Sequence, residues 1–172
     1  MRIQRRLAAL LALILLLPSC GGKEPEPQES GYVLWFCAAS GEEHGPALVS
    51  QPYEGENPGP EELLSALLAG PAQEGAASPF PRGVSVRQCL EDGERPGVLL
   101  VDLSEQYGAL ADISLTLADY SIVLTLSQLE WVEEVEITAG GRYVSYRSHQ
   151  LLSTQEAVLW DELAEEKEDL AA

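Results

Sequence analysis

Basic residues are scarce in this chain. Its 172 residues include 10 Lys and Arg against 28 Asp and Glu, which gives a net charge of −18. Arg2, Arg5 and Arg6 lie in the first six residues, so the rest of the chain carries 7 − 28 = −21 charges. A chain this acidic lacks the basic patches with which proteins bind nucleic acid or anionic lipid headgroups. The composition therefore excludes nucleic acid as a partner and indicates a solvated, acidic surface.

Histidine and cysteine are also rare. His44 and His149, the two histidines, have neither HxxH spacing nor neighbouring cysteines, so we expect surface histidines, no bound metal and no cofactor. Of the three cysteines, Cys37 and Cys89 fall in predicted strands. Either they form a disulfide or they stay buried as free thiols, because the distance between their Cα atoms decides the matter.

Recognisable catalytic motifs are missing too. No serine stands in a GxSxG elbow, and no glycine-rich loop has phosphate-binding spacing. The acidic run at residues 91–94 lacks the alternating ligands of an EF-hand loop, so a solvated turn is the better interpretation. Since no nucleophile stands beside a base, we expect a protein that is not an enzyme.

The apolar run at residues 7–17 is shorter than the roughly 20 residues that span a bilayer. It leads into Leu17-Pro18-Ser19-Cys20, in which Leu17, Ser19 and Cys20 resemble a bacterial lipobox. The resemblance implies cleavage between Ser19 and Cys20 and a diacylglyceryl thioether on Cys20. Acyl chains there would anchor the protein at the extracytoplasmic face of the cell membrane. The alternative is an ordinary secretory signal in which Cys20 is incidental.

Composition divides the chain into four segments. We predict a signal peptide (1–19), a lipidated cysteine with a flexible linker (20–30), a folded domain (31–148), and a C-terminal helix with an acidic tail (149–172). The linker residues 23–30 are rich in Pro and Glu and reach at most roughly 30 Å. The folded domain is therefore expected close to the membrane.

Strand and helix patterns alternate within the folded domain. Pro60, followed by two glutamates, is typical of a helix start, and Gly140-Gly141 of a hairpin turn. Pro52 cannot donate to a neighbouring strand, so its strand belongs at an edge. The expected order is strand 32–39, edge strand 47–53, helix 60–69, a hairpin of strands 84–90 and 98–103, helix 110–129, strand 132–138 and strand 142–147.

The helix predicted over residues 110–129 has a wide apolar stripe that includes Leu117 and Leu124. Such a helix is either sandwiched between two layers or packs one face on a sheet and another on a partner. Leu117 and Leu124 are therefore a candidate partner surface. The edge strand 47–53 is a second candidate, because an edge accepts a strand from a partner.

The C-terminal segment contains Ser153 and Glu156 at capping-box spacing, which predicts a helix through Trp160 and Leu163. The helix should end in the acidic run 165–169. Trp160 is expected to dock on the chain's own domain, and docking on a partner is the alternative. No internal repeat is evident, so the chain carries one copy of the domain.

Several short motifs, in this order, resemble the GerMN domain of sporulation and spore germination proteins. They are LLAGP at 67–71, VDLS at 101–104, LTLSQL at 124–129, VEI at 135–137 and the turn Gly140-Gly141. The resemblance covers roughly residues 32–147. It implies a small α/β (α+β) domain with two main helices packed on a mixed sheet of about five to six strands, similar to ring-building modules of envelope assemblies. The family has no known catalytic residues, so Asp102 is expected to cap the turn that follows it rather than to act as a general base.

The sequence thus predicts a non-enzymatic, membrane-anchored lipoprotein that serves as a protein-interaction module of the cell envelope, linked to sporulation or germination. Its expected partners are the membrane, through the lipid anchor, and an envelope protein; a homo-oligomer is compatible with this reading. The alternative is a ligand-binding lipoprotein that holds a wall fragment or a small solute, which would need a concave pocket with convergent polar groups. An envelope hydrolase is a third reading and would need an acid in a cleft.

Overall fold

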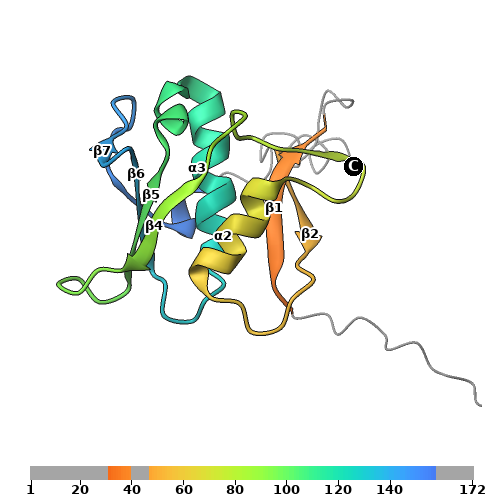
Figure 1. The fold of residues 1–172 in the computed structure, drawn as a ribbon, viewed down its shortest axis with the longest axis horizontal. Coiled ribbons are helices and arrows are strands. Elements are labelled where there is room, and N and C mark those ends of the chain that lie inside the picture. The colour runs from red at the N-terminus through yellow and green to blue at the C-terminus, as the bar shows by residue number, and fades with distance from the viewer. Residues whose placement is uncertain (1–30, 40–46, 158–172) are drawn as a thin grey trace, which may run out of the picture.

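The computed structural model describes residues 31–39 and 47–157. These residues form an α/β (α+β) domain in which the strands are divided between two sheets instead of forming one (Figure 1). The fold class and the two main helices agree with the prediction from sequence. The elements are, in order, β1 Val33–Ala38, β2 Leu48–Pro52, α2 Pro60–Ala69, β3 Ala76–Ala77, β4 Val86–Glu91, β5 Val98–Leu103, η2 Glu105–Ala109, α3 Asp112–Leu126, β6 Glu134–Ala139, β7 Arg142–Tyr143, β8 Leu151–Leu152 and η3 Thr154–Glu156.

The smaller sheet has three antiparallel strands in the order β2-β1-β3. β2 lies at the edge, as Pro52 predicted. Leu34 and Phe36 alternate with half-buried positions along β1, and both join the main core. β3 pairs only with Cys37 and Ala38, so most of that edge of β1 has no strand beside it.

The larger sheet has the order β4-β5-β6-β7, and β8 pairs with the other end of β6. β4 and β5 form the predicted antiparallel hairpin, with a register shift between Val86 and Gln88. β5 and β6 are parallel, so the chain must cross over between them, and α3 makes that crossover. Val135, Ile137 and Ala139 are buried on one face of β6.

α2 begins at Pro60, as predicted, because the Gly59 N–H donates to the Glu62 carboxylate at 2.8 Å and Pro60 needs no donor partner. The helix ends at Gly70, whose φ of 95° a residue with a side chain rarely adopts. Its three inward leucines, Leu63, Leu64 and Leu67, are fully buried. Each leucine buried in this way stabilises the fold by about 1.5–3 kcal/mol.

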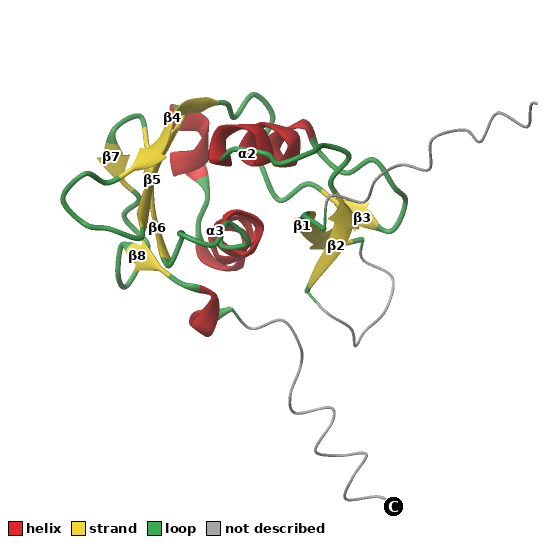
Figure 2. Cartoon of the chain, turned by 90° about the horizontal axis from the view of Figure 1, so that it is seen from below, coloured by secondary structure: helices red, strands yellow, loops and turns green. Residues whose placement is uncertain are grey.

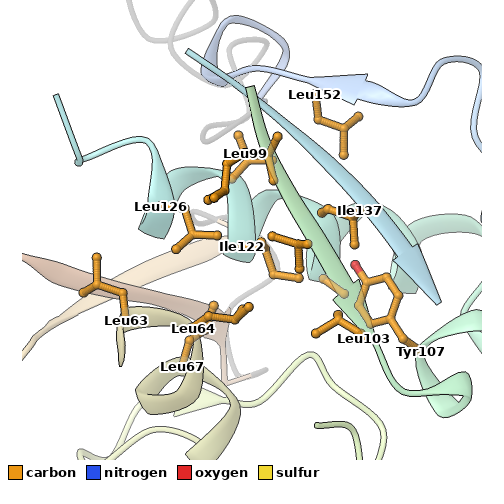
Figure 3. Packing of buried hydrophobic residues seen from close by; sticks show 14 of the residues in the cluster. Leu63, Leu64, Leu67, Leu99, Leu103, Tyr107, Ile122, Leu126, Ile137 and Leu152 are labelled. Atoms are coloured by element: carbon orange, nitrogen blue, oxygen red, sulfur yellow. The ribbon is translucent and has the colours of Figure 1, made fainter. Parts of the chain in front are cut away.

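α3 lies between the two sheets, and Figure 2 shows it end-on with strands on either side. This arrangement decides between the alternatives left by the wide apolar stripe: the helix is sandwiched. Ile122 and Leu126 point into a core that receives Leu99 and Ile137 from the larger sheet and the leucines of α2 (Figure 3). Within the described residues no helix is long and apolar enough to cross a membrane.

The prediction of one strand over residues 142–147 is wrong. β7 spans only Arg142–Tyr143, and the chain then turns so that Val144 and Arg147 both point inward. In an extended strand these two positions would face opposite sides of the sheet. The chain returns as β8, where Leu152 is buried beside Val135, so the larger sheet includes residues that sequence analysis placed in the C-terminal segment.

Two other differences concern short elements. η2 and β3 were not predicted, since both occupy segments read as loop. At the C-terminal end η3 replaces the start of the predicted helix, and the Ser153 side chain makes no capping bond there. The helix expected through Trp160 and Leu163 falls at residues that the structure does not describe.

Candidate functional site

The larger sheet packs one face on α2 and α3, and no helix of the described residues covers the opposite face (Figures 1 and 2). We call this opposite face the outer face. The strand register places two rows of side chains across it. One row is Leu90, Leu100, Glu136 and Leu151, and the other is Gln88, Asp102, Thr138 and Tyr143.

Asp102 holds the second row together. Its Oδ1 accepts hydrogen bonds from the Thr138 hydroxyl at 2.8 Å and from the Gly141 N–H at 2.7 Å. The Arg87 guanidinium lies 3.5 Å from its Oδ2. Asp102 is therefore a structural residue, as the resemblance implied, but it caps the glycine turn after β6 and not the turn that directly follows it. The prediction of the capped turn was wrong because parallel pairing with β6 brings a distant loop to the end of β5.

Arg95, in the loop between β4 and β5, contacts Glu136 of the first row. Its Nη2 lies 2.9 Å from Glu136, and its Nε donates to Asp92 at 2.6 Å. The Glu94 N–H donates to Asp92, and this bond, with the Arg95 bonds, keeps the pKa of the Asp92 carboxyl below its usual range. Asp92 thus makes the turn bond expected of a solvated turn at residues 91–94.

Two concave sites adjoin the outer face. A cavity of about 390 Å³, which we call the end cavity, lies at the glycine turn and is lined by Glu105, Gly108, Ala109, Ala139, Arg142, Tyr143, Val144 and Ser145. A smaller cavity of about 150 Å³ lies on the outer face itself, around Asp102 and Thr138. Tyr143 and Tyr146 are 59% and 73% exposed, so two aromatic rings stand free of the core beside the glycine turn.

Ser148, His149 and Glu156 form a hydrogen-bonded chain that sequence analysis did not predict. The Ser148 hydroxyl lies 2.9 Å from His149 Nδ1, and His149 Nε2 lies 3.0 Å from Glu156. The order of groups is that of a nucleophile, a base and an acid. All three are exposed, and none of them lines either of the two cavities described above. No group of described residues could hold a metal ion.

Cys37 and Cys89 are not joined in the structure, and they lie in strands of different sheets. Burial raises the pKa of the Cys37 thiol. Burial, and secondarily the Glu61 carboxylate, raises the pKa of Cys89 to about 12. Both thiols are therefore protonated and poor nucleophiles near neutral pH.

The predicted partner residues Leu117 and Leu124 are half-buried on the side of α3 that also carries Ile113 and Tyr120. Cys20, Ser19 and His44 lie outside the described residues, so the structure says nothing of the lipidation site. These predictions stay predictions.

A buried ion pair was missed by sequence analysis. Arg147 donates from Nε and Nη2 to Asp119 at 2.7 and 2.5 Å, and the Tyr107 hydroxyl donates to the same carboxylate at 2.5 Å. The side chains of Arg147 and Asp119 are only 4% and 5% exposed. Burial, and next the Asp119 charge, raises the pKa of Tyr107 well above its usual value. Asp119 stands within an apolar helix pattern, and a buried carboxylate requires a charged or hydrogen-bonding partner. The sequence does not show which residue this is, because Arg147 lies 28 residues further along the chain.

Residues 34–145 match the family called Germane, described as sporulation and spore germination. The chain belongs to this family. No curated protein matches the chain significantly.

Solved structures show the same fold. The first GerMN domain of the sporulation protein GerM from Bacillus subtilis aligns with a TM-score of 0.59 at 16% identity, over 73% of this chain and 98% of that one. The tandem GerMN domains of the same protein align with a TM-score of 0.52 at 17% identity, over 71% of this chain and 44% of that one. The present chain therefore has the GerMN fold that its motifs predicted.

Proposed function

We propose that this protein is a membrane-anchored extracytoplasmic lipoprotein whose GerMN domain is a non-enzymatic protein-interaction module, acting in sporulation or germination. Family membership over residues 34–145 supports the process. The basic, apolar and lipobox segments that end at Cys20 support the anchor. In this reading the domain is held near the outer surface of the cell membrane, where an envelope protein binds it.

The observation that carries the proposal is the uncovered outer face with its exposed aromatic rings. Tyr143 is exposed in one row of this face, and Leu90 on β4 is exposed in the other. Tyr146 is exposed three residues after Tyr143. Arg87, Arg95 and Arg142 all lie on this face or at the end cavity, although the chain is strongly acidic. Tyrosine and arginine are the residues in which binding energy at protein interfaces concentrates. A partner with acidic and apolar groups would suit this surface.

The first experiment is a crosslinking pull-down of the full lipidated chain from native membranes. The double variant Tyr143→Ala, Tyr146→Ala should fail to recover a defined envelope protein that the wild type recovers. Its urea midpoint of unfolding should equal that of the wild type. Trp131→Ala is the control, because Trp131 is an exposed aromatic residue between α3 and β6, outside both candidate surfaces. Leu117→Glu and Leu124→Glu test the surface predicted from sequence. Recovery of the same partner by the tyrosine variant would move the partner surface away from the outer face.

The end cavity favours a second candidate, a lipoprotein that holds a wall fragment or small solute. Its volume of about 390 Å³ is in the range of ligand pockets, and Glu105, Arg142 and Tyr143 converge on it. Soluble muropeptides titrated into the protein should then bind with measurable heat, and Arg142→Ala should weaken that binding. Silent titrations together with a recovered protein partner would reject this candidate and retain the first.

A further inference from the structure

α3 carries an apolar stripe that neither sheet covers completely. Ile113, Leu117, Tyr120 and Leu124 follow the spacing of one helix face, and we call them the α3 stripe. Ile113 is 75% exposed, and the other three are half-buried. The positions between them, such as Leu115, Ile122 and Val123, are buried in the core. The stripe is thus a surface distinct from the side by which α3 is sandwiched.

The described part of the chain ends beside the middle of this stripe. η3 packs against α3, and Figure 2 shows it next to the helix. Burial, followed by the charge of Glu156, raises the pKa of Tyr120, so the Glu156 carboxylate lies near the Tyr120 hydroxyl. The Glu156 carboxylate also lies 3.0 Å from His149 Nε2, and this second contact helps to hold the end of the described chain beside α3.

The residues that follow this point are apolar. Val158, Leu159 and Trp160 come directly after Ala157, Leu163 follows Asp161 and Glu162, and the acidic run begins at Glu165. We propose that residues 158–163 dock on the α3 stripe, with Trp160 and the neighbouring aliphatic side chains covering Ile113 and Leu117. The occupant of the surface that sequence analysis assigned to a partner is then the chain's own C-terminal segment.

The geometry allows this docking. Tyr120 and Ile113 are seven residues apart, or about 10 Å along α3 at 1.5 Å per residue. Six residues span about 20 Å when extended, which is enough to reach Ile113, and about 9 Å as a helix, which is enough to reach Leu117. Running in this direction also brings Asp161 and Glu162 toward the N-terminal end of α3, where the helix dipole favours negative charge.

This inference does not rest on the proposed function, because it concerns a contact within one chain. It leaves the outer face of the larger sheet free for a partner. A second copy of the chain and an envelope protein are the competing occupants of the stripe, and the experiment separates them.

The direct test is a cysteine pair in the full chain, in native membranes. Leu117→Cys with Trp160→Cys should form a disulfide under mild oxidation and keep the mobility of a monomer on a non-reducing gel. Glu130→Cys with Trp160→Cys is the control, since Glu130 is exposed beyond the C-terminal end of α3, away from Ile113 and Leu117. Equal bonding in both pairs, or bonds only between two chains, would overturn the proposal; the latter would make a second copy the occupant.

A second measurement needs no cysteine. Docking should protect the bond after Trp160 from chymotrypsin, because cleavage follows the population of the open form. Ile113→Glu should speed this cleavage roughly tenfold, and Ser114→Glu should leave it unchanged. Ile113 is exposed, so its substitution spares the core. Equal cleavage rates for wild type and Ile113→Glu would contradict the proposal, whatever partner the pull-down recovers.

Discussion

Gln128 binds both backbone groups of Val33. Its Oε1 accepts the Val33 N–H at 2.9 Å, and its Nε2 donates to the Val33 carbonyl at 2.7 Å. One helical turn earlier Thr125 Oγ1 accepts the Trp35 N–H at 3.1 Å. Thr125 in the last turn of α3 and Gln128 just after its end thus replace a missing strand along the edge of β1 that β3 does not reach. This gives a physical role to the LTLSQL motif by which the family was recognised.

The first prediction concerns this contact. Gln128→Ala leaves the N–H and the carbonyl of Val33 without their partners, and each unpaired group costs about 1–3 kcal/mol when water cannot replace the bond. Because the site is part-buried, we expect a total loss of about 2 kcal/mol in the free energy of unfolding, measured by urea titration. Glu130→Ala, an exposed change two residues away, is the control. A Gln128→Ala midpoint equal to that of the control would show that water satisfies Val33.

The second prediction concerns the buried pair of Asp119 and Arg147. Arg147→Met removes the cation and leaves a buried carboxylate, which should cost about 3–5 kcal/mol. Adding Asp119→Leu to this variant should restore much of the loss, because the uncompensated charge disappears. Thermal or urea unfolding of the four proteins completes the double-mutant cycle. Purely additive losses would mean that the two side chains do not act as a pair.

The third prediction concerns Cys89 and alkaline pH. The pKa of its thiol is raised to about 12 in the folded protein, against 9.0 for a free thiol. Above pH 9 the unfolded chain releases the proton while the folded chain keeps it, so stability falls as pH rises toward 12. Cys89→Ala should show a shallower fall between pH 9 and 10, where the tyrosines contribute equally to both proteins. Superimposed pH profiles would reject the raised pKa.

The raised pKa values of Cys37 and Cys89 should also lower the reactivity of the two thiols. Native protein at pH 8 should react with an aromatic disulfide reagent at Cys37 and Cys89 far more slowly than urea-unfolded protein does, because both pKa values are raised. Both thiols should be titratable after unfolding without a reductant. Their loss in material purified from cell membranes would mean that the two cysteines had been oxidised.

The fourth prediction concerns the glycine turn. Asp102→Ala removes the acceptor of the Thr138 hydroxyl and the Gly141 N–H, and we expect a loss of about 1–2 kcal/mol in stability. Since the turn carries Arg142 and Tyr143, partner recovery should fall as well. Asp102→Asn retains one oxygen acceptor and should lose less. The proposed role for Asp102 would fail if the alanine variant kept full stability.

Local patterns in the sequence determined much of this protein. The proline and two glutamates that start α2 and the glycines after β6 depend on neighbours within a few residues, and both features stand where the pattern placed them. The alternation expected for β4 is broken by the register shift after Val86, which leaves Leu90 exposed. The family motifs also lie within such short segments. The resemblance to a lipobox at Cys20 also comes from a short segment, and it stays a prediction because the structure does not describe these residues.

Only the tertiary structure decided how these pieces meet. The apolar stripe of α3 allowed a sandwich or a partner, and the division of the strands into two sheets selected the sandwich. Gln128 meets Val33 across 95 residues, and Arg147 meets Asp119 across 28. Arg147 left the predicted last strand because a buried carboxylate must be paired, and that requirement outweighs strand propensity. Such contacts depend on distances between elements, which the spacing of residues along the chain does not encode.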